Sequence, residues 1–175
     1  MPFVRGGKIV ADEFQRVDDE APIPDGVPAL LSAKRYLAEA GVLATRNAPL
    51  GVIWPNSRTV ADLAPYLDKL TTIALVFPSF RDGRAYSQAR LLRQRYKYRG
   101  ELRATGQVLR DQFLFMLRAG FTAFEAAKES DAEAFPEVIH RYTRYYQPSV
   151  DRRPVIAQER RKEDEEAPAP RRAAS

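Results

Sequence analysis

The chain has 175 residues, of which 45% are hydrophobic and 29% are charged, and its formal net charge is +5. This length favours one domain with terminal extensions, and the basic balance suits an anionic ligand or an acidic partner. Because cysteine is absent and His140 is the only histidine, the chain offers no disulfide, no cysteine-ligated iron–sulfur cluster and no metal site built from several histidines. Any chemistry would use carboxylates, lysines, arginines, tyrosines, hydroxyls or a bound organic cofactor.

Residues 1–28 predict an extended N-terminal arm. Short apolar runs on both sides of Gly6 and Gly7 are typical of a hairpin, and the segment DDEAPIPDGVP then breaks regular structure with three prolines and a glycine. The first residues contain no long apolar run and include the charged residues Arg5 and Lys8, which argues against a secretory signal. No segment approaches the roughly 18 apolar residues of a membrane span, so we expect a cytoplasmic protein without a membrane partner.

Residues 29–148 alternate between helix and strand patterns. A helix is expected from Ser32 to Gly41, and apolar runs predict strands at 50–54, 71–77, 101–106 and 121–126. Amphipathic patterns predict helices at 57–70, 83–99, 107–120 and 131–146. Four strand–helix units predict an α/β domain with a parallel sheet covered by helices, either a half-barrel or a flavodoxin-like open sheet. The pattern does not choose between these two architectures.

The apolar pattern ends near residue 148. Residues 151–175 contain seven basic and six acidic side chains and almost no large apolar ones. Such a composition cannot bury enough apolar surface to fold alone, so a disordered charged tail is expected at 149–175. A transient helix is compatible with residues 155–166.

In parallel α/β sheets, ligands bind beyond the carboxyl ends of the strands. The loop after the predicted strand at 71–77 is the richest of these positions. Gly83 permits a tight turn there, Asp82 can cap the next helix, and Arg81 and Arg84 offer planar forks for carboxylate, sulfate or phosphate. The alternative interpretation is an ordinary capped turn with exposed arginines and no ligand, which explains the same residues equally well.

The stretch from residue 81 to residue 110 is strongly basic. It contains nine Lys or Arg side chains against two acids, a local charge of +7, while the rest of the chain sums to −2. Within it, Arg93, Arg95, Lys97 and Arg99 are expected to form a docking face or a solvated helix face. No dinucleotide fingerprint, P-loop, nucleophile elbow or recognised nucleic-acid motif accompanies them, so we expect no nucleic-acid partner.

Two dense motifs occur within residues 74–125. The first, F-x-x-F-x-D-G-R-x-[YF]-S, is matched at Phe77, Phe80, Asp82, Gly83, Arg84, Tyr86 and Ser87. The second, R-x-x-G-x-V-L-R-D-Q, is matched at Arg103, Gly106, Val108, Leu109, Arg110, Asp111 and Gln112. With these motifs the chain resembles an uncharacterised bacterial family labelled as probable oxidoreductases involved in sulfite reduction, a domain of unknown function found beside assimilatory sulfite reductase genes. Weaker similarity extends over residues 2–148, and the resemblance carries no established catalytic residues.

Both motifs fall on loops that follow the carboxyl ends of predicted strands, where parallel α/β sheets bind ligands, a relation we call the strand-end rule. We therefore predict an anion- or partner-binding rim, which comprises Ser79, Arg81, Asp82, Gly83, Arg84, Tyr86, Ser87, Arg103, Gly106, Arg110 and Asp111. The resemblance implies an accessory protein of assimilatory sulfate and sulfite reduction, which would meet sulfite reductase or an acidic electron carrier through this rim. Redox work would require a borrowed cofactor such as flavin, because the chain has no cluster ligands.

The alternative is a half-barrel enzyme that acts on a small anionic substrate. In that case Arg81, Arg84 and Arg110 would hold the anion, and Asp82, Asp111 or Lys128 would act as acid or base.

Overall fold

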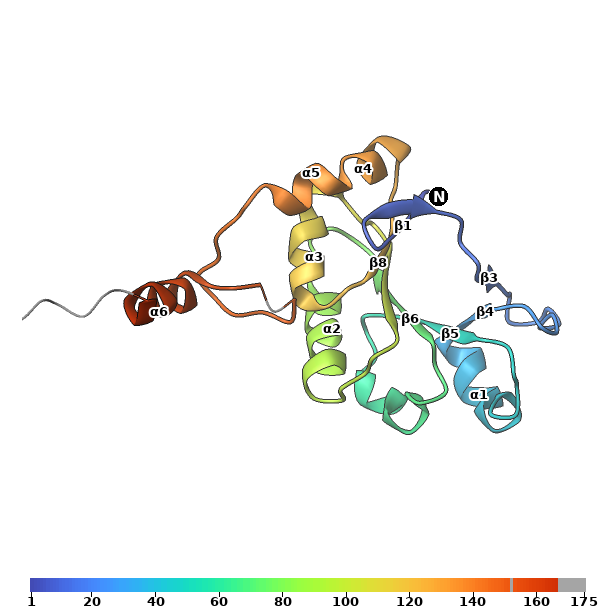
Figure 1. Ribbon diagram of the computed structural model, residues 1–175. Helices are drawn as coiled ribbons and strands as arrows, with labels where there is room; N and C mark the ends of the chain where they lie inside the picture. Colours follow the sequence, from blue (N-terminus) through green and yellow to red (C-terminus); the bar gives the residue numbers. More distant parts are fainter. Residues whose placement is uncertain (152, 167–175) are drawn as a thin grey trace, which may run out of the picture.

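The computed structural model describes residues 1–151 and 153–166, in which eight strands form one curled sheet (Figure 1). The strands are Phe3–Arg5 (β1), Lys8–Val10 (β2), Gln15–Arg16 (β3), Ala29–Ser32 (β4), Leu50–Trp54 (β5), Thr72–Phe77 (β6), Glu101–Gly106 (β7) and Ala123–Glu125 (β8). Their order in the sheet is β2-β1-β8-β7-β6-β5-β4-β3.

The sheet is a half-barrel and not a flavodoxin-like sheet. From β3 to β8 the strands are parallel and follow one another in chain order, whereas a doubly wound sheet reverses its order at a switch point. The predicted hairpin of β1 and β2 adds an antiparallel edge beside β8. Arg16 of β3 donates to Thr105 of β7 and Glu125 of β8, although β3 stands at one edge of the sheet and β8 lies towards the other. This contact requires the sheet to curl.

Helices cover the convex side of the sheet (Figure 1). The α-helices are Ala33–Leu43 (α1), Arg84–Gln94 (α2), Phe113–Ala119 (α3), Glu129–Glu133 (α4), Phe135–His140 (α5) and Ile156–Glu166 (α6), and Val60–Tyr66 (η1) and Arg110–Gln112 (η2) are 3₁₀ helices. The core lies between this side of the sheet and the helices. There Phe77 packs edge-on against Tyr86, with ring centroids 5.2 Å apart.

Several predicted helices differ from the structure. The helix expected at 57–70 is the shorter η1, because Pro65 has no N–H to donate within it. The helix expected at 131–146 is two short helices, α4 and α5, and ends at His140. The helix expected at 83–99 ends at Gln94, and Lys97 then adopts a left-handed conformation with φ of 55°. Strands β3 and β4 were not predicted.

The concave side of the sheet is crossed by residues 11–16, which we call the strap. The strap runs from β2 to β3 and therefore connects the two edges of the sheet. Its Asp12 carboxylate binds both terminal nitrogens of Arg103, at 2.6 and 2.9 Å, and its Phe14 ring lies 5.5 Å from the same guanidinium. The Arg103 side chain is completely buried and also contacts the carboxylates of Glu101 and Glu125, at 3.1 and 3.3 Å.

The described part of the C-terminal segment makes contacts with α3. Ser149 donates its hydroxyl to the carbonyl of Arg118, and the N–H of Val150 donates to the same oxygen. Helix α6 occupies the range in which a transient helix was expected. The predicted domain boundaries at 28 and 148 stay predictions, and residues 152 and 167–175 of the predicted tail lie outside the described residues. Among the helices that the structure describes, none has the length and apolar character needed to cross a membrane.

Candidate functional site

The turn after β6 is closed by an internal ion pair. The guanidinium of Arg84 donates to the Asp82 carboxylate from Nη2 at 2.6 Å and from Nε at 2.9 Å, and the Arg84 backbone N–H donates to the same carboxylate at 3.3 Å. The hydrogen bonds from Arg84 hold the pKa of the Asp82 carboxyl well below its usual range. Asp82 therefore shapes the turn, and the fork of Arg84 is used within the turn.

The loops that carry the two sequence motifs lie side by side at the carboxyl ends of β6 and β7. The N–H of Phe80 donates to the Gln107 side chain at 3.2 Å, and the Gln112 amide donates to the Phe80 carbonyl at 3.2 Å. Gly106 allows this approach, because its φ is +92° and a Cβ there would lie 2.4 Å from the carbonyl oxygen of Phe77. The strand-end rule thus selected two loops that are in direct contact.

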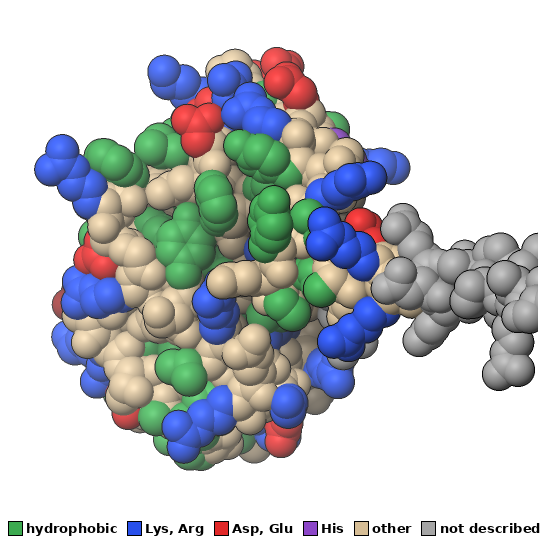
Figure 2. Space-filling view, turned by 90° about the vertical axis from the view of Figure 1, so that its left-hand side faces the viewer, with side chains coloured by type: hydrophobic (Ala, Val, Ile, Leu, Met, Phe, Trp, Pro, Cys, Tyr) green, Lys and Arg blue, Asp and Glu red, His purple; other side chains and the backbone are tan. Residues whose placement is uncertain are grey.

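A groove of about 590 Å³ separates α2 from α3 beside these loops, and we call it the α2/α3 groove. It is lined by Tyr86, Ser87, Arg90, Asp111, Gln112, Phe115 and Arg118. Tyr86 closes its floor by packing on Phe77 and Phe121, and burial raises the pKa of the Tyr86 phenol to about 12. On this side of the molecule, apolar side chains gather on the surface with Lys and Arg side chains around them (Figure 2). Those exposed on α2, α3 and the two loops are Phe80, Leu91, Leu109 and Phe115.

The structure brings most of the predicted rim together but not all of it. Three members, Tyr86, Ser87 and Asp111, line the α2/α3 groove. Seven others lie in the adjoining loops and helix starts, namely Ser79, Arg81, Asp82, Gly83, Arg84, Gly106 and Arg110. Arg103 lies apart from them, inside the half-barrel beneath the strap, where three carboxylates surround it.

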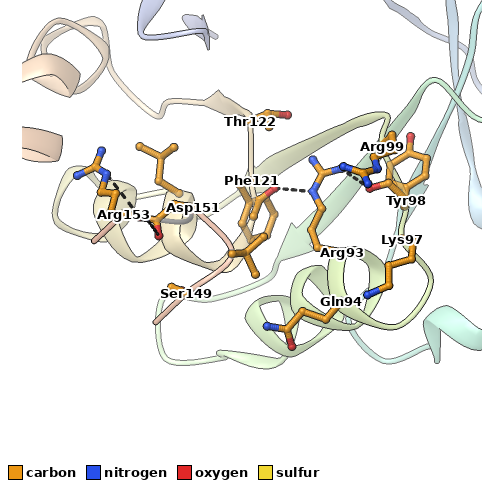
Figure 3. A pocket seen from close by; sticks show the side chains of 13 residues that line it. Arg93, Gln94, Lys97, Tyr98, Arg99, Phe121, Thr122, Ser149, Asp151 and Arg153 are labelled. Atoms are coloured by element: carbon orange, nitrogen blue, oxygen red, sulfur yellow. Dashed lines mark hydrogen bonds and ion pairs between the residues drawn. The ribbon is translucent and has the colours of Figure 1, made fainter. Parts of the chain in front are cut away.

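Two further cavities contain residues that the predicted rim omits. The larger, of about 830 Å³, lies at the amino ends of β7 and β8, beyond the ends of α2 and α3 (Figure 3). Three of its basic residues, Arg93, Lys97 and Arg99, belong to the stretch that the sequence identifies as a docking or solvated face, and the fourth is Arg153. The other, of about 620 Å³, lies at the carboxyl ends of β4, β5 and β6 and is lined by Asp19, Ser32, Ala33, Lys34, Leu37, Ile53, Pro55, Ser57, Arg58 and Val76. The strand-end rule selects part of this cavity, because Pro55, Ser57 and Arg58 follow the predicted strand at 50–54, whereas its other side follows β4, which was not predicted.

The described titratable groups include no cluster suited to a metal ion. Within residues 1–151 and 153–166, no group of three or more His, Cys, Asp or Glu side chains is arranged to hold a metal ion. The three carboxylates around Arg103 are arranged about its guanidinium, which donates to each of them. Their role is therefore to stabilise the buried charge of Arg103.

The curled parallel sheet and its helical cover place this chain among the α/β half-barrel proteins. Within that class, residues 51–156 match a family described as "Bacterial protein of unknown function (DUF934)". The match covers more than half of the chain and includes both sequence motifs, and the chain belongs to this family. The sequence matches no curated protein at a significant level. The resemblance to a bacterial domain of unknown function is thereby confirmed, and no comparison links the chain to sulfite reduction or to redox activity.

Proposed function

We propose that this protein is an accessory protein of assimilatory sulfate and sulfite reduction, and that it docks an acidic redox partner on the α2/α3 groove. The partner would be sulfite reductase or an acidic electron carrier. The pathway rests on the resemblance of the two sequence motifs. The docking surface rests on one observation, which is the exposure of four large apolar side chains, together with arginines, on the two helices and two loops that border the groove.

The apolar side chains favour a protein partner. The exposed fractions are 61% for Phe115, 51% for Phe80, 43% for Leu91 and 41% for Leu109. Single exposed apolar residues are common, whereas a cluster rimmed by polar residues marks an interaction site. Two of the four belong to the motif loops, which the contacts of Gln107 and Gln112 hold in place.

The charges favour an acidic partner. Arg81, Arg90 and Arg110 are exposed, and none of them forms a salt bridge with any residue that the structure describes. Asp111 is the one acidic residue that lines the groove. A partner that presents carboxylates around an apolar contact would be steered to this surface and oriented by it.

A docking role also suits the side-chain chemistry of the chain. No cysteine is present, so a cysteine-ligated iron–sulfur cluster that transfers electrons would belong to the partner. The arginines that remain unpaired lie on the surface, where they act on association more than on a buried reaction centre.

The proposal is tested with a double variant, Phe80→Ser with Phe115→Ser, and with the matched control Val42→Ser. Val42 is 78% exposed on α1, away from the groove, so its substitution removes an equally accessible apolar side chain. Binding to purified sulfite reductase and to its electron carrier is measured by biolayer interferometry, and each variant is used to complement a gene deletion during growth on sulfate. We expect the double variant to lose binding and growth and the control to retain both. The proposal would be refuted if the double variant bound the partner as tightly as the wild-type protein. It would also be refuted if the deletion strain grew normally on sulfate.

A charge-reversal variant tests the steering separately. Arg90→Glu is expected to lower the association rate constant by about tenfold at low salt, and the difference should shrink as salt screens the charges. An unchanged rate constant at low salt would exclude electrostatic steering by this face.

The alternative function, a half-barrel enzyme for a small anionic substrate, is supported by the cavity at the carboxyl ends of β4, β5 and β6. Half-barrel relatives of the (βα)₈ architecture place ligands at this end. Here the cations would be Lys34 and Arg58, which make no salt bridge within the described residues, in place of Arg81, Arg84 and Arg110. If Lys34→Ala with Arg58→Ala abolishes growth on sulfate while docking of sulfite reductase is intact, the enzyme is favoured over the accessory protein.

A further inference from the structure

A cavity of about 830 Å³ lies at the amino ends of β7 and β8, away from both surfaces proposed above. It is lined by Arg93, Gln94, Lys97, Tyr98, Arg99, Leu117, Gly120, Phe121, Thr122, Ser149, Val150, Asp151 and Arg153. Figure 3 shows side chains from the end of α2 on one side of this space and Ser149, Asp151 and Arg153 on the other.

Arg93 forms a rigid wall of the cavity. Its guanidinium donates to three carbonyl oxygens, those of Gly120 at 2.9 Å, Tyr98 at 2.7 Å and Gly100 at 2.8 Å. Gly120 is required for this approach, because its φ is +110° and a Cβ there would lie 2.6 Å from the Cγ of Arg93. The three acceptors are neutral, and no carboxylate among the described residues forms a salt bridge with Arg93.

The segment after α2 holds two more cations at the cavity. Lys97 and Arg99 line the cavity from exposed positions and form no salt bridge with any described residue. Lys97 is the one non-glycine residue with positive φ among the described residues, at 55°. A left-handed lysine costs roughly 1 kcal/mol, and such strained residues concentrate at functional sites.

Among the described residues, the one carboxylate that lines the cavity, that of Asp151, is already engaged. Asp151 lies 3.5 Å from the guanidinium of Arg153 and 3.7 Å from that of Arg118. The hydroxyls of Ser149 and Thr122 contact main-chain groups, so they are also partly used. Burial and, to a smaller extent, the neighbouring charge of Arg99 lower the pKa of Arg93.

We infer that this cavity binds an organic anion that carries a phosphate or sulfate group, with Lys97 and Arg99 contacting the oxyanion. The volume exceeds what an inorganic ion needs, and Leu117, Phe121 and Val150 provide an apolar wall for the rest of the molecule. The charged wall of Arg93 repels cations and needs no rearrangement to accept an anion. This site is independent of the proposed docking role.

The test uses the full chain and four probes, which are adenosine 5′-monophosphate, 4-nitrophenyl sulfate, inorganic phosphate and inorganic sulfate. Binding is measured by isothermal titration calorimetry at low salt, and the backbone amides of Gly120, Thr122 and Val150 are followed by NMR. The test variant is Lys97→Gln with Arg99→Gln. The control is Arg95→Gln, which removes an exposed arginine from the same helix end that does not line the cavity.

At least one ester is expected to bind saturably and to shift the three amides, and the double variant should weaken its affinity by about tenfold or more. The control should change the affinity by less than about twofold. Preference for the phosphate or the sulfate ester then identifies the oxyanion. The inference is overturned if neither ester binds, if the inorganic ions bind as tightly as the esters, or if Arg95→Gln weakens binding as much as the double variant.

Discussion

Replacing Arg103 tests whether the strap is held to the half-barrel by the buried ion cluster. Arg103→Met removes a guanidinium that is completely buried and bound to Asp12, Glu101 and Glu125. Removing one partner of a buried ion pair typically costs about 3–5 kcal/mol, because the remaining charge stays desolvated. Here Glu101 keeps Arg5 at 2.7 Å, so we expect a loss near the lower end of that range, about 3 kcal/mol.

Replacing Asp12 should cost less unfolding free energy than replacing Arg103, because the Asp12 side chain is 30% exposed and Arg103 retains two carboxylates. Asp12→Asn should lower the free energy of unfolding by about 1.5–2 kcal/mol, the lower part of the range for hydrogen bonds to charged groups. The double variant should cost at least about 1 kcal/mol less than the sum of the single variants, because the two residues interact directly.

Urea unfolding provides the measurement. Trp54 is the only tryptophan and is fully buried, so its fluorescence reports the global transition. Arg95→Met, at an exposed position, is the control and should change stability by less than about 0.5 kcal/mol. An Arg103→Met variant within about 1 kcal/mol of wild type, or strictly additive losses, would show that packing rather than the ion cluster holds the strap.

Three further outcomes are expected. Gly106→Ala should destabilise the protein by at least about 1–2 kcal/mol in urea unfolding, because φ is +92° and the new Cβ meets the Phe77 carbonyl; a wild-type midpoint would contradict this geometry. Arg84→Ala should raise the pKa of the Asp82 carboxyl towards its ordinary value in an NMR titration, because the lost hydrogen bonds favoured the charged form, and an unchanged pKa would assign the shift to another group. The folded-state pKa of Tyr86, about 12, lies above its unfolded value of 10.0, so the stability it contributes is present below pH 10 and is lost as pH rises towards 12. Tyr86→Phe should therefore flatten the fall in unfolding free energy over that window, and a fall as steep as in wild type would show that other groups cause it.

The strands of the central sheet could be predicted because they are short continuous apolar runs. The predicted bounds 50–54 and 101–106 coincide with β5 and β7, and 71–77 differs from β6 by one residue. Strand β4 is only four residues long and follows a proline-rich segment, and β3 has two residues, so neither carries a periodic signal. Without β3 and β4, the sequence could not show the consecutive parallel order from β3 to β8 that distinguishes a half-barrel from a flavodoxin-like sheet.

The position of the loops was predictable, whereas the pairing of side chains was not. Asp82 and Gly83 predict a turn by their local chemistry, and the structure places a turn there. The contact between Asp12 and Arg103 joins residues 91 positions apart and leaves no local trace. The sequence did contain one sign of a polar face on β7. The segment ELRATG alternates polar and apolar residues, and its polar side chains all face the strap.

The excess positive charge of residues 81–110 divides into two groups with different consequences. Arg84, Arg93 and Arg103 are occupied by a carboxylate, by three carbonyls and by three carboxylates, so substituting them changes the turn, the loops or the strap. The remaining cations are exposed and without carboxylate partners among the described residues, namely Arg81, Arg90, Arg95, Lys97, Arg99 and Arg110. Binding of an acidic partner or an anion must therefore depend on the second group, because the first cannot release its partners without loss of structure. A charge substitution in the second group that alters function but not stability is the result that would separate recognition from folding.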